Sequence, residues 1–281
     1  MQTIILMGAG QMGQAALRLV NRTNYSVIAI ADNNAALHGQ SLSGIPICSA
    51  AEAVALHPDA VVITVAGQDR TAQMIQQLRQ IGYQGEIRTL QEYADALDIR
   101  GAVFDLLVDR IAKLPGDLAE LGVYRGAFAS HINHCFPDRT LYLFDTFEGF
   151  DSRDVAIELQ GKYSRAVEGD FADTSVDLIL SKMSAPEHVV VRKGYFPETT
   201  EGLEASFAFV SLDADLYEST LNGLNWFYPR MVSGGVILLH DYQNARFSGV
   251  QAAVEAYEKK CGPLLLLPVG DLHGSAMVIH P

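Results

Sequence analysis

The sequence predicts an α/β protein with two Rossmann-like units, a small N-terminal one and a larger one with a doubly wound, mostly parallel sheet. Two observations support this prediction. Short apolar segments alternate with segments of helical periodicity, without low-complexity stretches or solenoid repeats. In addition, a glycine-rich turn lies between an apolar strand and a helix twice, at residues 8–13 and 122–126, which indicates two nucleotide-type folds.

The first unit is placed at residues 1–95. Its glycine turn follows the first strand, because glycine permits the tight turn that leads into a helix. About four strands indicate a half-sized Rossmann unit, and Ser-Gly-Ile-Pro at residues 43–46 is predicted as a turn. Strands are expected at residues 3–7, 25–31, 60–66 and 86–90, and helices up to residue 21 and at 50–56, 68–81 and 91–113.

The second unit is placed at residues 96–281. The helix over residues 99–113 is expected to link the units and to cover the ligand of the second one. Parallel strands are expected at residues 118–122, 141–144, 189–192, 207–212 and 235–239, and an antiparallel pair at 264–268 and 276–280. Helices are expected at residues 125–135, 176–183, 219–228 and 249–260.

Composition excludes several classes of protein. Hydrophobic residues make up 49% of the 281 residues and charged residues 19%, as in globular chains. A net charge of −13 argues against nucleic acid or an anionic membrane as partner, and no apolar run reaches the ~20 residues of a membrane span. The first residues are predicted as a strand rather than a signal peptide, and three scattered cysteines suit a reducing compartment, so we expect a cytoplasmic protein.

The N-terminal glycine turn matches a dinucleotide fingerprint. Gly8, Gly10 and Gly13 follow a strand, and Asp32 ends the next strand about 20 residues later. Alternatively, the glycines only pack helix against strand. The GAGQMG turn, the ADN end and the VVITVAG strand resemble small N-terminal domains of surface-polysaccharide enzymes. We predict that this unit carries out no chemistry and binds a nucleotide or nucleotide sugar, supports dimer formation, or positions an acceptor.

The second glycine turn indicates a nucleoside site. Gly122 and Gly126 let the backbone approach a ligand, and Asp145 ends the next strand, where it is placed for the ribose hydroxyls. Glu120 ends the first strand and is placed to receive an ammonium group. An adenosyl group with an amino acid end describes S-adenosylmethionine, which we predict as the cofactor.

Acidic residues end the next strands of the predicted sheet. Asp213 and Asp215 follow the strand at residues 207–212, and Asp241 follows the one at 235–239. Adjacent strand ends bring such carboxylates to one edge of the sheet, where they suit a hard cation such as magnesium. The alternative is that no metal binds.

From about residue 115 to 280 the chain resembles the macrocin O-methyltransferase family. The segments that carry the resemblance are PGDLAELGVYRG, LYLFDTFEGF, DFADTS, KGYFPET, SLDADLYEST, FYPR, SGGVILLHDY and AVEAY, in family order. The resemblance implies a Rossmann-like fold and methyl transfer from S-adenosylmethionine to a sugar hydroxyl with a divalent metal, usually magnesium. It further implies Tyr124 beside the methionine part of the cofactor, and around the adenine Thr146, Phe147, Gly194, Tyr195 and Phe196.

The resemblance also implies metal ligands at Asp213, His240 and Asp241. The family has two acids where this chain has His240 and Asp241, a departure that weakens a magnesium site or favours a metal tolerating imidazole, such as manganese or zinc. The family's catalytic histidine has no counterpart between residues 151 and 173, so Asp215 is predicted as the base. Its alternative role is that of an N-cap or a salt-bridge partner at the following helix. Asp213 and Asp215 are therefore the predicted catalytic residues.

His131 and His134 have the spacing of two metal ligands on one helix, but no companion ligand is evident in the sequence. We therefore expect them on an exposed helix face, and Cys135 beside them in the core.

These observations predict an O-methyltransferase that acts on a sugar or a glycosylated natural product, with a small-molecule or glycan acceptor as partner. A homo-oligomer is compatible with the sequence. Two alternatives stay open: an NAD-dependent oxidoreductase that uses the N-terminal GAGQMG turn, and an inactive nucleotide-binding scaffold.

Overall fold

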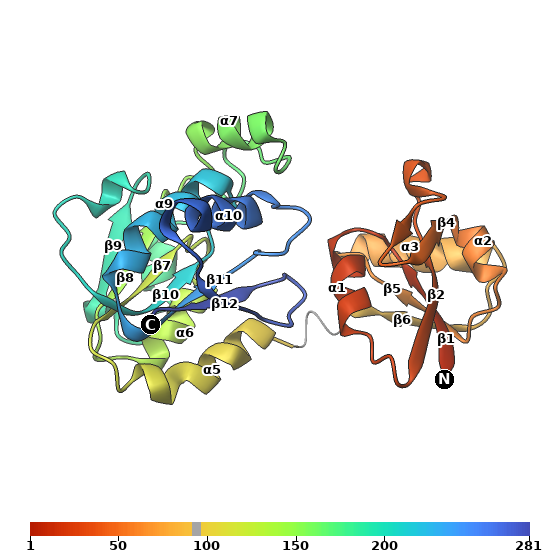
Figure 1. Ribbon diagram of the computed structural model, residues 1–281, viewed down its shortest axis with the longest axis horizontal. Helices are drawn as coiled ribbons and strands as arrows, with labels where there is room; N and C mark the ends of the chain where they lie inside the picture. Colours follow the sequence, from red (N-terminus) through yellow and green to blue (C-terminus); the bar gives the residue numbers. More distant parts are fainter. Residues whose placement is uncertain (92–96) are drawn as a thin grey trace. The chain divides into compact units, whose positions relative to one another are not determined.

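The computed structural model describes residues 1–91 and 97–281 and divides into two compact units (Figure 1). One comprises Met1–Asp98 with Gly270–His273, and the other comprises Ile99–Val269 with Gly274–Pro281. The predicted boundary between residues 95 and 96, and part of the predicted helix at 91–113, lie outside the described residues. Over the residues described, no helix is long and apolar enough to cross a membrane.

The N-terminal unit is a Rossmann-like sheet covered by helices on both faces. In the described residues its sheet has six strands in the order β3-β4-β2-β1-β5-β6, in which β3 pairs antiparallel with β4 and the other pairs are parallel. The strands are β1 (Gln2–Met7), β2 (Tyr25–Ala31), β3 (Ser41–Leu42), β4 (Ile45–Cys48), β5 (Ala60–Ile63) and β6 (Glu86–Thr89). The helices are α1 (Gln11–Leu19), η1 (Ala35–Leu37), α2 (Ala50–Val54) and α3 (Gln68–Gln80).

The expectation of four strands and a half-sized unit was wrong. The predicted turn at residues 43–46 is the hairpin that joins β3 to β4, with Ser43 at φ 50° and Gly44 at φ 81°. These two strands escaped the sequence pattern because they are short and Pro46 lies within β4. Across the sheet, the five parallel strands lie in the order β4, β2, β1, β5, β6. Numbered along the chain, this is the order 3-2-1-4-5, as in a nearly complete dinucleotide-binding sheet.

The C-terminal unit has a seven-stranded sheet, among the residues described, in the order β12-β13-β11-β10-β7-β8-β9. The predicted antiparallel pair, β12 with β13, is confirmed, and β13 also pairs antiparallel with β11. The remaining neighbouring strands are parallel. The strands are β7 (Asp117–Leu121), β8 (Leu141–Asp145), β9 (Val189–Lys193), β10 (Phe207–Leu212), β11 (Met231–Leu239), β12 (Leu265–Pro268) and β13 (Ala276–Ile279). The helices are α5 (Ile99–Ile111), α6 (Ala127–Cys135), α7 (Ser152–Gly161), α8 (Val176–Leu180), η2 (Pro186–His188), η3 (Glu198–Thr200), α9 (Tyr217–Phe227), η4 (Tyr228–Arg230) and α10 (Gly249–Cys261).

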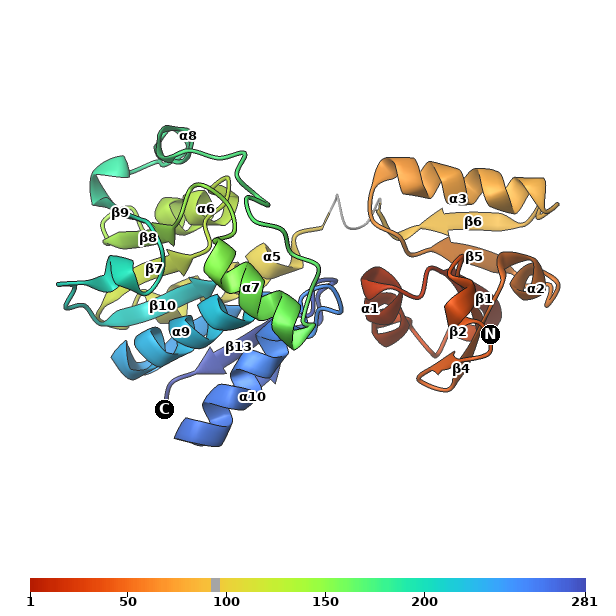
Figure 2. The ribbon, with the colours of Figure 1, turned by 90° about the horizontal axis from the view of Figure 1, so that it is seen from above.

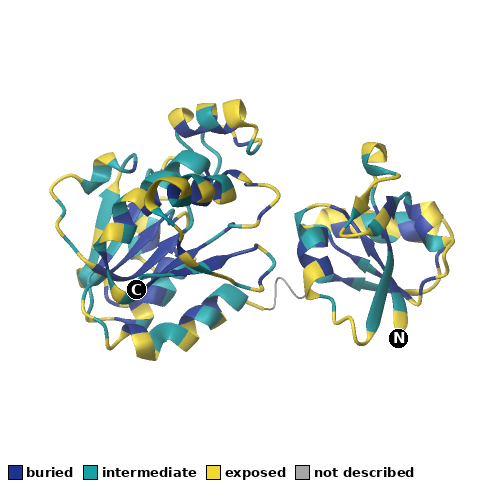
Figure 3. Ribbon diagram, in the orientation of Figure 1, coloured by how far each residue is buried: buried dark blue, intermediate teal, exposed yellow. Residues whose placement is uncertain are grey.

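Helices cover both faces of this second sheet, α9 and α10 on one and α5 and α6 on the other (Figures 1 and 2). Strand β11 shows why: Val236 and Leu238 pack towards α5 and α6, whereas Ile237 and Leu239 pack towards α9 and α10. The strands are buried between exposed outer helix faces (Figure 3). Helix α7, which the sequence analysis did not predict, packs near α9.

Candidate active site

The predicted glycine turn lies at the carboxyl end of β7. Gly122 has φ 84°, and a Cβ there would overlap the carbonyl oxygen of Asp213 at the end of the neighbouring strand β10. Gly126, with φ 71°, is the N-cap of α6, where a Cβ would press on the side chain of Ile179. Both positions therefore require glycine for backbone and packing reasons, independently of any ligand.

Asp145 ties the end of β8 to this turn. Its Oδ2 accepts hydrogen bonds from the backbone N–H groups of Val123 at 2.7 Å and Tyr124 at 2.9 Å, and its Oδ1 accepts one from Phe147 at 2.7 Å. Tyr124 has φ 48°, is partly exposed, and donates its phenol to Asp173 at 3.1 Å. The predicted ribose acid thus lies at the glycine turn, as expected, but it also holds the turn's backbone.

Some of the residues expected around an adenine also have structural roles, in packing and in hydrogen bonds. Phe147 and Phe196 are each 5% exposed, and Phe196 stacks on Phe227 with the centroids of their rings 5.6 Å apart. These two rings pack in the core clusters, and their assignment beside an adenine stays a prediction. The remaining residues line the surrounding turns: Gly194 donates to the carbonyl of Asp145, Thr146 to that of Gly149, and Tyr195 to the carboxylate of Asp154.

A buried arginine from α5 reaches the same strand ends. The Arg100 guanidinium donates to Asp213 Oδ2 at 2.5 Å and to Ser211 Oγ at 2.6 Å, and lies 3.5 Å from Glu120 Oε1. Glu120 and Ser211 are paired across β7 and β10 and face the α5 side of the sheet. The guanidinium also lies over the ring of Phe128, 4.1 Å from its centroid.

The other oxygen of Glu120, Oε2, is buried and has no hydrogen-bond partner among the residues described. Burial raises the pKa of Glu120 to about 8, although the positive charge of Arg100 opposes this shift. Because Oε2 has no partner among the residues described, a cationic group could bind there. Arg100 and Ser211 were missed by the sequence analysis. The only signal for Arg100 was its position in a helix expected to cover the ligand.

The predicted acids meet at the ends of β10 and β11. One carboxylate oxygen from each of Asp213, Asp215 and Asp241 lies within 4.8 Å of the others. Asp241 also accepts a hydrogen bond from the Asn244 side chain at 2.5 Å. His240 Nδ1 lies 2.9 Å from Asp213 Oδ1 and 3.3 Å from Asp241 Oδ1. Three clustered carboxylates fit a hard divalent cation.

The charges of this cluster are strongly coupled. Burial and the neighbouring Asp213 raise the pKa of Asp215 well above its usual value. Burial would also raise the pKa of Asp213, but His240 and Arg100 outweigh it and hold that pKa well below its usual range. Asp213 and Asp241 likewise raise the pKa of His240, against the effect of burial. The site therefore already contains two cationic partners for Asp213.

The alternative role of Asp215 as a helix cap is wrong. Helix α9 begins after Leu216, which is its N-cap, and no side chain caps it. Asp215 has φ 58° and shares a hydrogen bond with Asp241.

The N-terminal fingerprint residues also meet at one strand end. A Cβ on Gly13 would overlap the carbonyl of Gly8, and one on Gly8 would lie 2.9 Å from the carbonyl of Thr64, so both glycines serve packing. Gly10 has open space where a Cβ would be. Asp32 accepts hydrogen bonds from the N–H groups of Ala9 at 2.7 Å and Asn34 at 2.8 Å.

Comparison with known proteins identifies similarities to both parts of the chain. Residues 98–264 match the family model of macrocin O-methyltransferase (TylF), and residues 1–86 match the model "C2185-like, N-terminal". The solved structure of the O-methyltransferase NovP superposes with a TM-score of 0.53 at 23% identity, over 65% of this chain and 79% of that one. This last likeness shows the fold alone.

Two curated relatives are similar to part of this chain. The 8-demethyl-8-(2,3-dimethoxy-alpha-L-rhamnosyl)-tetracenomycin-C 4'-O-methyltransferase of Streptomyces olivaceus is 28% identical over 180 residues, 58% of this chain and 65% of that protein. The mycinamicin III 3''-O-methyltransferase of Micromonospora griseorubida is 31% identical over 143 residues, 46% of this chain and 56% of that protein. The chain thus spans less than two thirds of the length of either relative. Because the family model covers more than half of the chain, the protein belongs to the macrocin O-methyltransferase family.

Proposed function

We propose that this protein transfers a methyl group from S-adenosylmethionine to a hydroxyl of a sugar or glycosylated natural product. Membership of the family supports the reaction class. The observation that carries the proposal is the meeting of a glycine turn, a buried glutamate and three aspartates at the carboxyl edge of one sheet. The acceptor class is supported by the rhamnosyl group in the name of one relative.

The residues at β7 and β8 fit the cofactor. S-adenosylmethionine supplies an electrophilic methyl group when it is bound. In our proposal, Gly122 lets the backbone approach it, and Asp145 is placed for the ribose hydroxyls while holding the turn. Glu120 accepts the ammonium group, because its Oε2 is buried and lacks a partner in the described residues. Arg100 bridges Glu120 and Asp213 and holds both side chains in place.

We also propose a divalent cation, magnesium or manganese, held by Asp213 and Asp241 with Asp215 beside it. Such a cation would lower the pKa of an acceptor hydroxyl. Repulsion within the carboxylate cluster supports this assignment. His240 was expected as a ligand; we place it beside the ligands instead, since its Nδ1 contacts the carboxylates of Asp213 and Asp241. Asp215 stays our candidate for the base.

Calorimetric titration tests the cofactor assignment. The parent chain should bind S-adenosylmethionine and S-adenosylhomocysteine below millimolar concentration, and Asp145→Asn should weaken binding by roughly 10-fold or more, the loss of one charge-assisted hydrogen bond. Asparagine is preferred to alanine because Asp145 also supports three backbone N–H groups. Absence of cofactor binding to the folded parent would refute the proposal.

Labelled methyl transfer to a panel of glycosylated acceptors then tests the reaction. The inactive-scaffold alternative predicts cofactor binding with no transfer to any acceptor. The oxidoreductase alternative predicts tight NAD binding that depends on Asp32. The comparisons do not favour it, because the family model covers the C-terminal unit and the named relatives are methyltransferases.

For the N-terminal unit we propose a binding role without chemistry, either towards a nucleotide or in dimer formation or acceptor positioning. The open space at Gly10 supports nucleotide binding, whereas Gly8 and Gly13 are explained by packing alone. Titration with nucleotides and nucleotide sugars, compared between the parent and Asp32→Asn, tests this role.

A further inference from the structure

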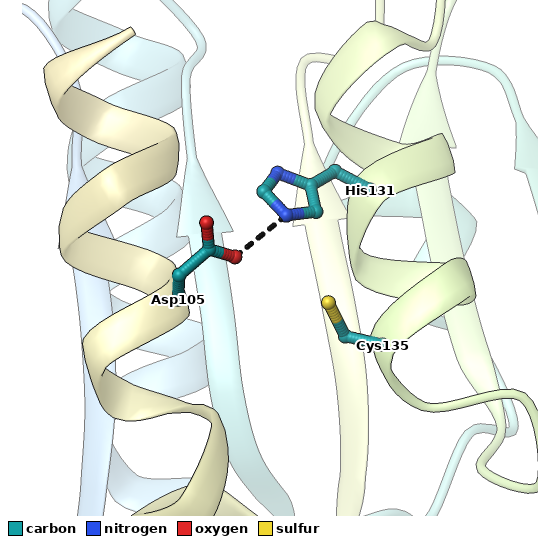
Figure 4. A group of neighbouring side chains, drawn as sticks. All are labelled: Asp105, His131 and Cys135. Carbon is teal, nitrogen blue, oxygen red and sulfur yellow. Dashed lines mark hydrogen bonds and ion pairs between the residues drawn. The ribbon is translucent and has the colours of Figure 1, made fainter.

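Three side chains with metal-binding chemistry lie together on α5 and α6, outside the site described above. Asp105 belongs to α5, and His131 and Cys135 belong to α6. One ligand atom from each lies within 4.8 Å of the other two, and His131 Nε2 lies 2.7 Å from Asp105 Oδ1. Figure 4 shows the three side chains directed into the space between the two helices.

Helix geometry and helix packing explain this arrangement. His131 and Cys135 are four residues apart, so they share one face of α6. Phe104, next to Asp105, is fully buried, and its ring packs edge-on against the rings of Phe128 and His131, each with centroids 5.3 Å apart. This contact brings Asp105 to the α6 face.

His131 is 30% exposed and His134 is exposed, as the sequence predicted for this helix face. The sequence showed no companion for them, and the structure brings Asp105 to His131 across 26 residues. Cys135, expected in the core, is half-buried and packs against a core cluster, and His134 is not part of the group.

A thiolate, an imidazole and a carboxylate are all ligands of zinc, whereas magnesium prefers oxygen ligands alone. We propose that Asp105, His131 and Cys135 bind one Zn²⁺ ion, with water completing a tetrahedral shell. Zinc bonds of about 2.0–2.3 Å require ligand atoms roughly 3.3–3.8 Å apart, so binding requires small adjustments of these side chains, which lie within 4.8 Å of one another. Asp105 is 57% and His131 30% exposed, so the ion can enter from solvent.

The cluster is poorly suited to the other common role of a cysteine beside a histidine and an acid, that of a nucleophile. Burial, followed by the negative charge of Asp105, raises the pKa of the Cys135 thiol. A nucleophilic cysteine needs a lowered pKa before it reacts, whereas Zn²⁺ displaces the proton of a ligating thiol as it binds. A bound ion instead joins α5, which carries Arg100, to α6, which follows the glycine turn.

Cobalt serves as the spectroscopic probe, because Co²⁺ bound to a thiolate absorbs in the near ultraviolet by charge transfer and Co²⁺ bound only to carboxylates does not. The full chain, freed of metal by chelation, is titrated with Co²⁺ and then with Zn²⁺ as competitor. We expect one thiolate-bound ion per chain, displaced by zinc. Cys135→Ser should abolish the charge-transfer band, and His131→Gln and Asp105→Asn should weaken zinc binding by ~10-fold or more.

Matched controls share the chemistry of the proposed ligands but lie elsewhere. Cys48→Ser and Cys261→Ser each remove another free cysteine, and His134→Gln removes the neighbouring exposed histidine of α6. All three should keep the band and the affinity. Zinc should also raise the melting temperature of the parent but not of Cys135→Ser.

Two results would overturn the proposal: a parent spectrum without a thiolate band, or a band that survives Cys135→Ser. Cobalt binding without thiolate absorption that is lost in Asp213→Asn would locate the ion at the carboxylate cluster and would also overturn it. Circular dichroism of the metal-free variants checks their folding. Should Cys135→Ser fail to fold, Asp105→Asn decides, because Asp105 is exposed, and unchanged zinc affinity in that variant refutes the site.

Discussion

Glu120 and Arg100 form a buried pair at the centre of the proposed site. Glu120 is 2% exposed, and one of its oxygens faces Arg100 and Ser211 while the other has no partner among the residues described. A buried carboxyl with such a partial set of contacts is destabilising when ionised. Such a free-energy cost is typical of a group that binds a ligand. It makes the stability of the folded protein depend on pH.

We predict that Glu120→Gln becomes more stable relative to the parent as pH rises from about 5 to 8. The pKa of Glu120 is raised from 4.5 in the unfolded chain to about 8 in the folded protein. In this window the folded parent binds more protons than the unfolded one, so its stability falls with rising pH, by at most about 1.4 kcal/mol per pH unit from this group. Glutamine does not titrate. Urea unfolding of both proteins across this range measures the difference, and a constant difference would contradict the prediction.

Asp213 contacts both Arg100 and His240, one through each of its carboxylate oxygens. We predict that Asp213→Asn lowers the rate of methyl transfer by orders of magnitude if a cation stabilises the developing alkoxide, each factor of ten corresponding to about 1.4 kcal/mol. EDTA should suppress turnover of the parent, and magnesium or manganese should restore it. Labelled methyl transfer measures both effects, and full activity in chelator would refute the role of the metal.

Among the elements, the glycine turns that follow β1 and β7 are held by the same kind of hydrogen bond in the two units. In each, an aspartate that ends the second strand accepts a hydrogen bond from a backbone N–H of the glycine turn, Asp32 from Ala9 and Asp145 from Val123. In both units this contact fixes the turn against the neighbouring strand. The acid of the fingerprint therefore has a structural role that does not depend on a bound nucleotide.

Helix α5 is held to the sheet and to α6 by Phe104. Its ring lies in contact with the ring of Phe209, with centroids 4.8 Å apart, and is fully buried. We predict that Phe104→Ala lowers the free energy of unfolding by about 3–5 kcal/mol, because it leaves a cavity in the core. Leu106→Ala on the same helix is the control, since Leu106 is 84% exposed and its loss should stay within about 0.5 kcal/mol. Chemical denaturation compares them, and equal effects would show that α5 is not anchored through Phe104.

For the chain as a whole, the division into two units predicts that the C-terminal unit folds and binds the cofactor without the N-terminal unit. A truncated chain that begins at Asp98 keeps α5 with Arg100 and every residue that we assign to S-adenosylmethionine. It should fold and bind the cofactor with an affinity close to that of the full chain. Circular dichroism and calorimetric titration measure this. A folded fragment that no longer binds the cofactor would show that the units depend on one another.

The full-length chain provides the complementary test of the same assignment. Asp32→Ala should leave methyl transfer within a few-fold of the parent, because we assign no catalytic role to the N-terminal unit. Loss of transfer in a folded Asp32→Ala protein would make the N-terminal site part of the chemistry.

The sequence by itself determined the α/β class and most strands. It also determined that the glycine turns and the acids follow the ends of strands. Strands β2 and β10 occupy the predicted residues, because apolar runs bounded by polar turns are a local signal. Gly122 and Asp145 could likewise be assigned, since a strand, a tight turn and a helix in sequence leave few alternatives. Elements with weak local signals were missed, as β3, β4 and α7 were.

Tertiary structure alone decided which side chains meet. Arg100 contacts Asp213 across 113 residues, and Asp105 contacts His131 across 26, because the register of β7 with β10 and the packing of α5 on α6 bring them together. On the opposite face of the sheet, packing against Phe144 and Phe227 placed Phe196 in the core. Such contacts depend on the sheet register and on the rotation of each helix about its axis, and neither quantity is contained in a local pattern of residues.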